Sequence, residues 1–88
     1  MDIDSIRRVV VDSVLEIAPE ADFSRVDPGR SMREQIDLDS FDFLNLLIAL
    51  QGRLGVAVPE SDYRLVDSLD GLVTYLAQHQ GPGGVTAA

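Results

Sequence analysis

Residues 36–44 place one hydroxyl, that of Ser40, where an acidic segment passes into an apolar one. Asp39 and Ser40 are both residue types that cap helix starts, and the apolar run begins at Phe41. The start of a helix exposes backbone N–H groups without partners and the positive end of the helix dipole, and both favour a phosphate. The pattern therefore predicts that the Ser40 hydroxyl carries a phosphate-linked group.

Other kinds of chemistry find little support in the sequence. His79 is the single histidine, and it falls at the expected end of the last helix. An imidazole is favourable at a helix C-terminus, so this role is a better explanation than membership of a Ser-His-Asp triad. A calcium loop counted from Asp37 fails, because Asp42 stands at the sixth position instead of Gly and Ile48 at the twelfth instead of Glu. The absence of lysine excludes a Schiff base, and the absence of cysteine excludes thiolate ligands. We therefore expect neither an enzyme nor a metal site.

The dipeptide Asp-Ser occurs four times in the chain, and three of these copies, those of Ser13, Ser40 and Ser68, are weighed as candidate sites. Ser13 falls in the middle of the first apolar-periodic segment and is set aside. Ser40 and Ser68 both stand at expected helix starts, where ordinary capping contributes about 1 kcal/mol and needs no further function. Capping alone is therefore the alternative to a functional role for Ser40.

Size and composition indicate one small acidic domain. The 88 residues are 45% hydrophobic, which argues against disorder. Fifteen acidic residues against seven basic ones give a net charge of -8, which repels nucleic acid and attracts basic partner surfaces, although the same charge also serves solubility alone. Neither a basic-then-apolar leader nor a run of about 18 apolar residues occurs, so we expect a cytoplasmic protein that does not enter a membrane.

The elements that must position the site are helices, as the apolar spacing indicates. Residues 2–18 carry apolar side chains three and four positions apart until Pro19 ends the pattern. The members of this stripe are Ile3, Ile6, Val10, Val14 and Ile17. A last helix, capped by Asp67 or Ser68, has the same spacing at Leu69, Leu72, Val73 and Leu76.

A second helix is expected over residues 40–54, ending near Gly55. Its apolar positions cover roughly 200° of the helix circumference, which is more than one core face requires. A central position in the bundle is the simplest explanation. The alternative is that part of this surface faces a partner or an apolar cargo.

Residues 19–38 form a long connection, which we expect to be pinned to the bundle by apolar side chains. These anchors are Phe23, Val26, Met32, Ile36 and Leu38. Ser31 and Glu34 have capping-box spacing and predict one helical turn, and another short turn is expected over residues 61–65.

Together these elements predict an all-α fold, a small antiparallel bundle of three main helices plus one short helix. Residues 1–80 form the helical domain, and residues 81–88 form a flexible Gly-rich tail.

Residues 38–50, in which Asp39-Ser40-Phe41 opens an apolar helix, resemble the acyl carrier protein family. In that family an Asp-Ser-Leu motif opens the second helix, and its Ser carries 4′-phosphopantetheine. The resemblance extends over residues 3–80, including the long first loop. It implies that a phosphopantetheinyl transferase moves the arm from coenzyme A to Ser40, and that the arm then holds acyl groups as thioesters.

Asp67-Ser68-Leu69 matches the family's triplet more literally than Asp39-Ser40-Phe41 does. Only one helix follows Ser68, however, whereas three follow the family's Ser. Ser68 is therefore interpreted as a helix cap and Ser40 as the attachment site.

The resemblance also implies partners, namely acyl-loading and acyl-processing enzymes with basic docking patches. The residues expected to meet them are Asp37, Asp39, Phe41, Asp42 and Asn45. Phe41 replaces the family's usual Leu, while Gln51 and Arg53, with Asn45, dilute the acidity of the second helix. This departure favours a dedicated fatty-acyl, polyketide or related pathway over general fatty-acid synthesis.

Because the sequence starts at Met1 almost directly in the first helix, we expect a free-standing, monomeric carrier. The alternative is an unmodified helical interaction module in which Ser40 is only a helix cap.

Overall fold

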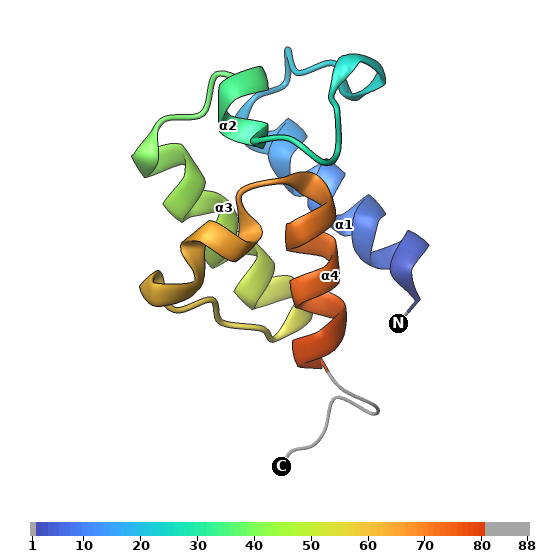
Figure 1. Ribbon diagram of the computed structural model, residues 1–88, viewed down its shortest axis with the longest axis vertical. Helices are drawn as coiled ribbons and strands as arrows, with labels where there is room; N and C mark the ends of the chain where they lie inside the picture. The colour runs from blue at the N-terminus through green and yellow to red at the C-terminus, as the bar shows by residue number, and fades with distance from the viewer. Residues whose placement is uncertain (1, 81–88) are drawn as a thin grey trace.

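The computed structural model describes residues 2–80, and within this range the protein is a helical bundle without strands (Figure 1). The three main helices are α1 (Ile3–Ile17), α3 (Ser40–Leu54) and α4 (Leu69–Gln80). They are joined by η1 (Phe23–Arg25), α2 (Met32–Gln35) and η2 (Glu60–Val66). Helix α1 packs against both α3 and α4 and runs opposite to them. The predicted all-α bundle is confirmed, while the predicted tail, residues 81–88, lies outside the described residues.

Helix α1 follows the predicted apolar spacing except in its first turn. Asp2 caps the helix, because its Oδ1 accepts a hydrogen bond from the Ser5 N–H at 2.7 Å. The fully buried members of the stripe are Ile6, Val10 and Val14. Ile3, by contrast, is 49% exposed, since the first turn projects beyond the other helices (Figure 1). The prediction that Ile3 belongs to the buried stripe was wrong.

The long connection from α1 to α3 is pinned as predicted. Its buried anchors are Met32, Ile36 and Leu38, and Phe23 and Val26 are half-buried against the core. This anchoring leaves the segment around residues 36–39 resting on the bundle directly before α3 begins.

Helix α2 begins after Ser31 as predicted, but the expected capping box is absent because the Ser31 side chain makes no cap hydrogen bond. Instead, the Met32 N–H donates to the Asp67 carbonyl at 2.9 Å, beside an isolated antiparallel bridge between Ser31 and Ser68. The start of α2 is thereby fastened to the start of α4.

The ends of the other helices agree with the sequence signals. Gly55 has φ 73° and ends α3 in the left-handed conformation that glycine adopts without strain. Ser68 acts as a cap, because its Oγ accepts a hydrogen bond from the Gly71 N–H at 2.9 Å. The predicted short turn near residues 61–65 is the 3-10 helix η2.

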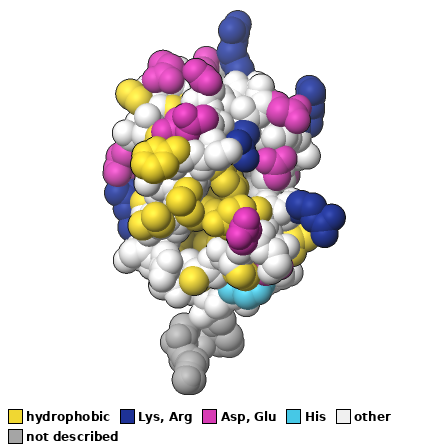
Figure 2. Space-filling view, turned by 90° about the vertical axis from the view of Figure 1, so that its left-hand side faces the viewer, with side chains coloured by type: hydrophobic (Ala, Val, Ile, Leu, Met, Phe, Trp, Pro, Cys, Tyr) yellow, Lys and Arg dark blue, Asp and Glu magenta, His cyan; other side chains and the backbone are white. Residues whose placement is uncertain are grey.

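Helix α3 has a buried inner face and an apolar outer ridge. The inner residues are Phe43, Leu46, Leu47, Leu50 and Leu54. Phe41, Leu44 and Ile48, which lie three and four positions apart, are 70%, 42% and 57% exposed. Figure 2 views the molecule from the side of α3 and η2, and shows hydrophobic side chains gathered on this face with acidic ones around them. The central position expected for the whole apolar surface of α3 was therefore wrong for the outer ridge, Phe41, Leu44 and Ile48.

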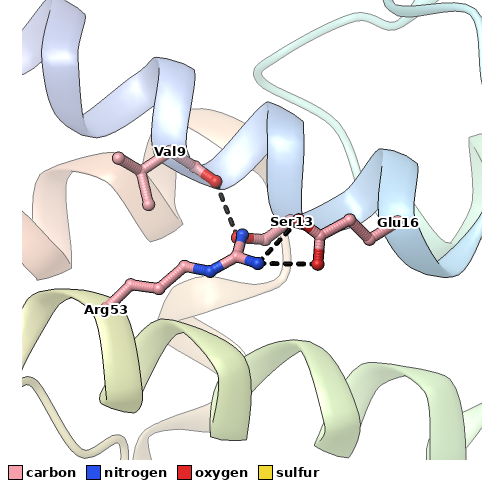
Figure 3. Close-up of polar contacts among 4 residues, drawn as sticks. All are labelled: Val9, Ser13, Glu16 and Arg53. Atoms are coloured by element: carbon pink, nitrogen blue, oxygen red, sulfur yellow. Dashed lines mark hydrogen bonds and ion pairs between the residues drawn. The ribbon is translucent and has the colours of Figure 1, made fainter.

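The far end of α3 is tied to α1 by a polar contact that the sequence did not reveal (Figure 3). Arg53 Nη1 donates to Ser13 Oγ at 2.6 Å, and its Nη2 donates to both carboxylate oxygens of Glu16 at 2.6 Å. The Ser13 hydroxyl in turn donates to the Val9 carbonyl at 2.7 Å, so this 1% exposed polar group is satisfied. Arg53 thus turns towards α1, and its charge is paired instead of diluting an acidic surface.

Candidate functional site

Ser40 is the first residue of α3, and it is exposed. The helix cap is Asp39, whose Oδ1 accepts a hydrogen bond from the Asp42 N–H at 2.8 Å. The Asp42 carboxylate completes a capping box by accepting from the Asp39 N–H at 3.5 Å. The sequence left the cap open between Asp39 and Ser40, and the structure assigns it to Asp39. The alternative in which Ser40 serves only as the cap is therefore wrong in that respect.

One basic side chain reaches the Ser40 hydroxyl. Arg33, on α2, donates from Nη2 to Ser40 Oγ at 3.1 Å and from Nε to the Leu38 carbonyl at 3.4 Å. Its guanidinium carbon also lies 5.4 Å from the centre of the Phe43 ring, within the range of a cation–π contact. The sequence reasoning missed Arg33, because a residue seven positions before Ser40 meets it only after the connection has folded back.

Two clefts lie beside this side chain. One, of about 280 Å³, is lined by Arg33, Phe43, Tyr63, Arg64 and Asp67. The other, of about 360 Å³, is lined by Ser31, Arg33, Glu34, Leu38 and Asp67. In the first, the Phe43 and Tyr63 rings meet edge to face, with centroids 5.8 Å apart, and form an apolar wall between α3 and η2.

The predicted partner-facing residues all lie at the start of α3 or immediately before it. Asp37, Asp39, Phe41 and Asn45 are exposed and Asp42 is half-buried. Asp39 and Asp42 also hold the capping box, so a substitution that removes the side-chain acceptor at either position alters the helix start as well as the surface charge.

The remaining polar groups of interest lie on α4 and η2. His79 is in the last turn of α4, where its Nδ1 lies 2.9 Å from the Tyr75 carbonyl oxygen and its ring stacks on Tyr75. The Tyr75 hydroxyl donates to Asp62 at 2.7 Å, and this hydrogen bond, together with burial and the Asp62 charge, raises the pKa of Tyr75 above 10.0. A cleft of about 410 Å³ on this side contains Tyr75 but none of the predicted site residues. Residues 2–80 hold no cluster of three or more potential metal ligands.

The fold and the site define a class of protein: a small helical domain that presents an exposed serine at a helix start, next to a cation. A family model described as "Phosphopantetheine attachment site" matches residues 4–76. The chain therefore belongs to the acyl carrier protein family.

Individual relatives agree with this family. An acyl carrier protein from Rubrobacter xylanophilus is 27% identical over 77 residues, which cover 84% of this chain and 95% of the relative. One from Campylobacter hominis is 32% identical over 73 residues, covering 83% of this chain and 86% of the relative. A mitochondrial acyl carrier protein 2 from Arabidopsis thaliana is 29% identical over 73 residues, covering 80% of this chain and 58% of the relative. No solved structure matches the chain significantly.

Family membership indicates a covalently attached 4′-phosphopantetheine group. The residues at the start of α3 fit such a group, because an exposed hydroxyl there has an arginine N–H donor 3.1 Å away. The family also implies a phosphopantetheinyl transferase and biosynthetic enzymes as partners. Within residues 2–80, no helix is both long and apolar enough to cross a membrane.

Proposed function

We propose that this protein is a free-standing acyl carrier in which Ser40 bears the 4′-phosphopantetheine arm. The observation that carries the proposal is the setting of Ser40: its side chain is exposed at the start of α3, and Asp39 provides the helix cap in its place. This exposed hydroxyl accepts a hydrogen bond from Arg33 but does not cap the helix, so it is available for modification. Two other Asp-Ser candidates have hydroxyls with structural roles: Ser13 Oγ contacts the Val9 carbonyl and Arg53, and Ser68 Oγ accepts from the Gly71 N–H.

In the proposed modification, Ser40 Oγ loses its proton and bonds to the phosphorus that carries the pantetheine of coenzyme A. The phosphoanhydride bond of coenzyme A breaks, and the adenosine bisphosphate leaves. The protein itself supplies an accessible hydroxyl and a recognisable surface, and the partner enzymes perform the catalysis. When the arm is attached, its thiol holds acyl intermediates as thioesters.

Intact-mass measurement tests the attachment site. The protein is incubated with coenzyme A and a broad-specificity phosphopantetheinyl transferase. One added arm is expected on the wild type and on Ser68→Ala, whose hydroxyl is a helix cap. No addition is expected on Ser40→Ala. An arm on Ser40→Ala, or none on the wild type, would overturn the proposal.

Partner recognition is proposed to use the acidic residues Asp37, Asp39 and Asp42, with Phe41 and Asn45, against basic patches on cytoplasmic enzymes. The net charge of -8 supports steering of this kind. The exposed ridge, Phe41, Leu44 and Ile48, supports a partner with an apolar strip beside its basic patch. This mixed surface favours a dedicated fatty-acyl, polyketide or related pathway.

Asp39→Asn separates recognition from capping, because Asn caps helices about as well as Asp but carries no charge. We expect the thermal midpoint to move little, while kcat/KM of the transferase falls roughly tenfold as steering weakens. Asp12→Asn, an exposed change on α1 that removes the same charge, is the matched control and should leave kcat/KM unchanged. Equal rates for both variants would remove Asp39 from the recognition surface.

The second candidate function is an unmodified interaction module that docks partners through the outer ridge of α3. The exposure of Phe41, Leu44 and Ile48 favours it. It predicts that partner binding is lost in Ile48→Ser but is indifferent to Ser40→Ala. The carrier proposal instead predicts that Ser40→Ala stops the transfer of acyl groups completely.

A further inference from the structure

Arg33 is a basic residue that lies beside the Ser40 hydroxyl in a protein whose net charge is -8. Among residues 2–80 the ion pairs are Arg7–Asp70 and Arg53–Glu16, so Arg33 forms none. Asp67 lines both neighbouring clefts with Arg33 but is not ion-paired to it. The side chain is nevertheless held in place by the Leu38 carbonyl, the Ser40 hydroxyl and the face of Phe43.

Holding a long arginine side chain costs rotamer entropy, and a hydrogen bond to an exposed neutral hydroxyl returns little. An arginine N–H donor forms much stronger hydrogen bonds with an anionic oxygen. The guanidinium is therefore placed for a negative charge that arrives at Ser40, and the Leu38 carbonyl orients it in advance.

The helix start itself has limited capacity for such a charge. The Asp42 N–H already donates to Asp39, and both carboxylates of the capping box lie in the first turn of α3. They oppose the positive end of the helix dipole. A phosphodiester on Ser40 would stand beside these two carboxylates, so it needs a cation from outside α3.

We propose that Arg33 binds the phosphodiester attached to Ser40 and fixes the direction in which the arm leaves the protein. This inference rests on the proposed attachment at Ser40. On modification, the Arg33 Nη2 N–H would donate to a non-bridging oxygen of the phosphodiester instead of to Ser40 Oγ. Arg33 is thus a positioning residue for the arm and a counter-charge to Asp39 and Asp42.

The test compares apo and holo forms of each variant, so that any effect of a substitution on folding cancels. Holo protein is prepared by transferase treatment and confirmed by intact mass. The quantity measured is the holo-minus-apo difference in thermal midpoint, for wild type, Arg33→Gln, Arg33→Lys and Arg8→Gln. Arg8 is an exposed residue of α1, and its substitution changes the net charge by the same amount.

Arg33→Gln is expected to lower the holo-minus-apo difference by about 5 °C relative to wild type, since one charge-assisted hydrogen bond is lost. Arg33→Lys should keep part of the difference, and Arg8→Gln all of it. Raising the salt concentration should shrink the wild-type difference, because exposed charges are screened. Equal differences in Arg33→Gln and Arg8→Gln would overturn the proposal.

A second readout needs only the wild type. The Nε–Hε resonance of Arg33 in a ¹H–¹⁵N NMR spectrum should shift on attachment of the arm, while that of Arg8 should not. An unshifted Arg33 resonance in confirmed holo protein would overturn the role of Arg33 but leave the attachment site intact. Absence of an added mass would instead overturn the attachment at Ser40.

Discussion

The two ends of α3 each carry an arginine–serine contact, and the two contacts have opposite settings. At the C-terminal end, Arg53 reaches Ser13, which is 1% exposed, and pairs with Glu16. At the N-terminal end, Arg33 reaches Ser40, which is exposed, and forms no ion pair within residues 2–80. The first contact satisfies its groups inside the protein, whereas the second leaves both a hydroxyl and a cation open to a ligand.

The difference shows that residue type and local spacing do not decide the role of a serine. The Ser13 hydroxyl joins α1 to α3 and the Ser68 hydroxyl caps α4, whereas the Ser40 hydroxyl is exposed, accepts from Arg33 and caps no helix. Helix α3 is accordingly anchored at its C-terminal end and accessible at its N-terminal end.

The largest effect is expected from Leu50→Ala, in the anchored half of α3. Leu50 is 1% exposed, and removing its buried methyl groups should cost about 2–5 kcal/mol of unfolding free energy. Leu44→Ala, on the outer ridge at 42% exposure, should change it by less than about 1 kcal/mol. Urea unfolding of both apo variants measures this. Similar losses for the two would mean that the outer ridge also belongs to the core.

Two glycines, Gly71 in α4 and Gly52 in α3, differ in how closely other residues approach them. A Cβ at Gly71 would lie 2.4 Å from the Leu65 carbonyl oxygen, so α4 and η2 approach closely only because residue 71 has no side chain. Gly71→Ala should destabilise the protein by about 1–3 kcal/mol. At the anchored end of α3, Gly52 has nothing within 4 Å of its Cβ position, and Gly52→Ala should stabilise by about 0.5–1 kcal/mol. Thermal or urea unfolding measures the sign of the stability change in each variant. A Gly71→Ala variant as stable as wild type would show that η2 can shift away from α4.

The two arginine–serine contacts can be compared directly in the apo protein. Ser13→Ala removes a buried hydroxyl that donates to the Val9 carbonyl and accepts from Arg53, so a loss of about 1 kcal/mol is expected. Ser40→Ala removes an exposed hydroxyl that is not the cap, so a change within about 0.5 kcal/mol is expected. A larger loss for Ser40→Ala than for Ser13→Ala would reverse the proposed division between anchored and open ends.

Much of this fold follows from local signals in the sequence. Period-3.6 apolar spacing predicts the three main helices, and Gly55 and Ser68 mark helix boundaries that the structure confirms. The placement of Ser40 at the start of α3 is confirmed for the same reason, since capping types and the onset of an apolar run are close together in the chain.

The features that were missed depend on contacts between distant segments. Arg53 and Ser13 are 40 positions apart, and no spacing rule links them. The outer ridge of α3 is indistinguishable in sequence from its inner face, because which apolar residues become buried depends on where α1, η2 and α4 pack. The capping box predicted at Ser31 gave way to a backbone contact with the start of α4, which the sequence of α2 alone does not encode.

The smallest expected effect concerns the attachment of η2 to α4, next to the open end of α3. The Tyr75 hydroxyl donates to Asp62 Oδ2 at 2.7 Å, and this bond, with burial and the Asp62 charge, raises the pKa of Tyr75 from 10.0. The folded protein thus favours neutral Tyr75, while tyrosine in the unfolded chain ionises near pH 10. The stability from this contact is complete below about pH 10 and is lost as the pH rises through the higher pKa of the folded state.

Tyr75→Phe removes the titrating group, so the difference in unfolding free energy between wild type and Tyr75→Phe should stay constant up to about pH 9 and narrow as the pH rises above about 10. Asp62→Asn keeps an acceptor but removes the charge. The difference in unfolding free energy between Asp62→Asn and Tyr75→Phe should therefore narrow less steeply with pH. The measurement is urea unfolding across the pH series. A difference that stays constant up to about pH 11 would show that ionisation of Tyr75 does not weaken the attachment of η2 to α4.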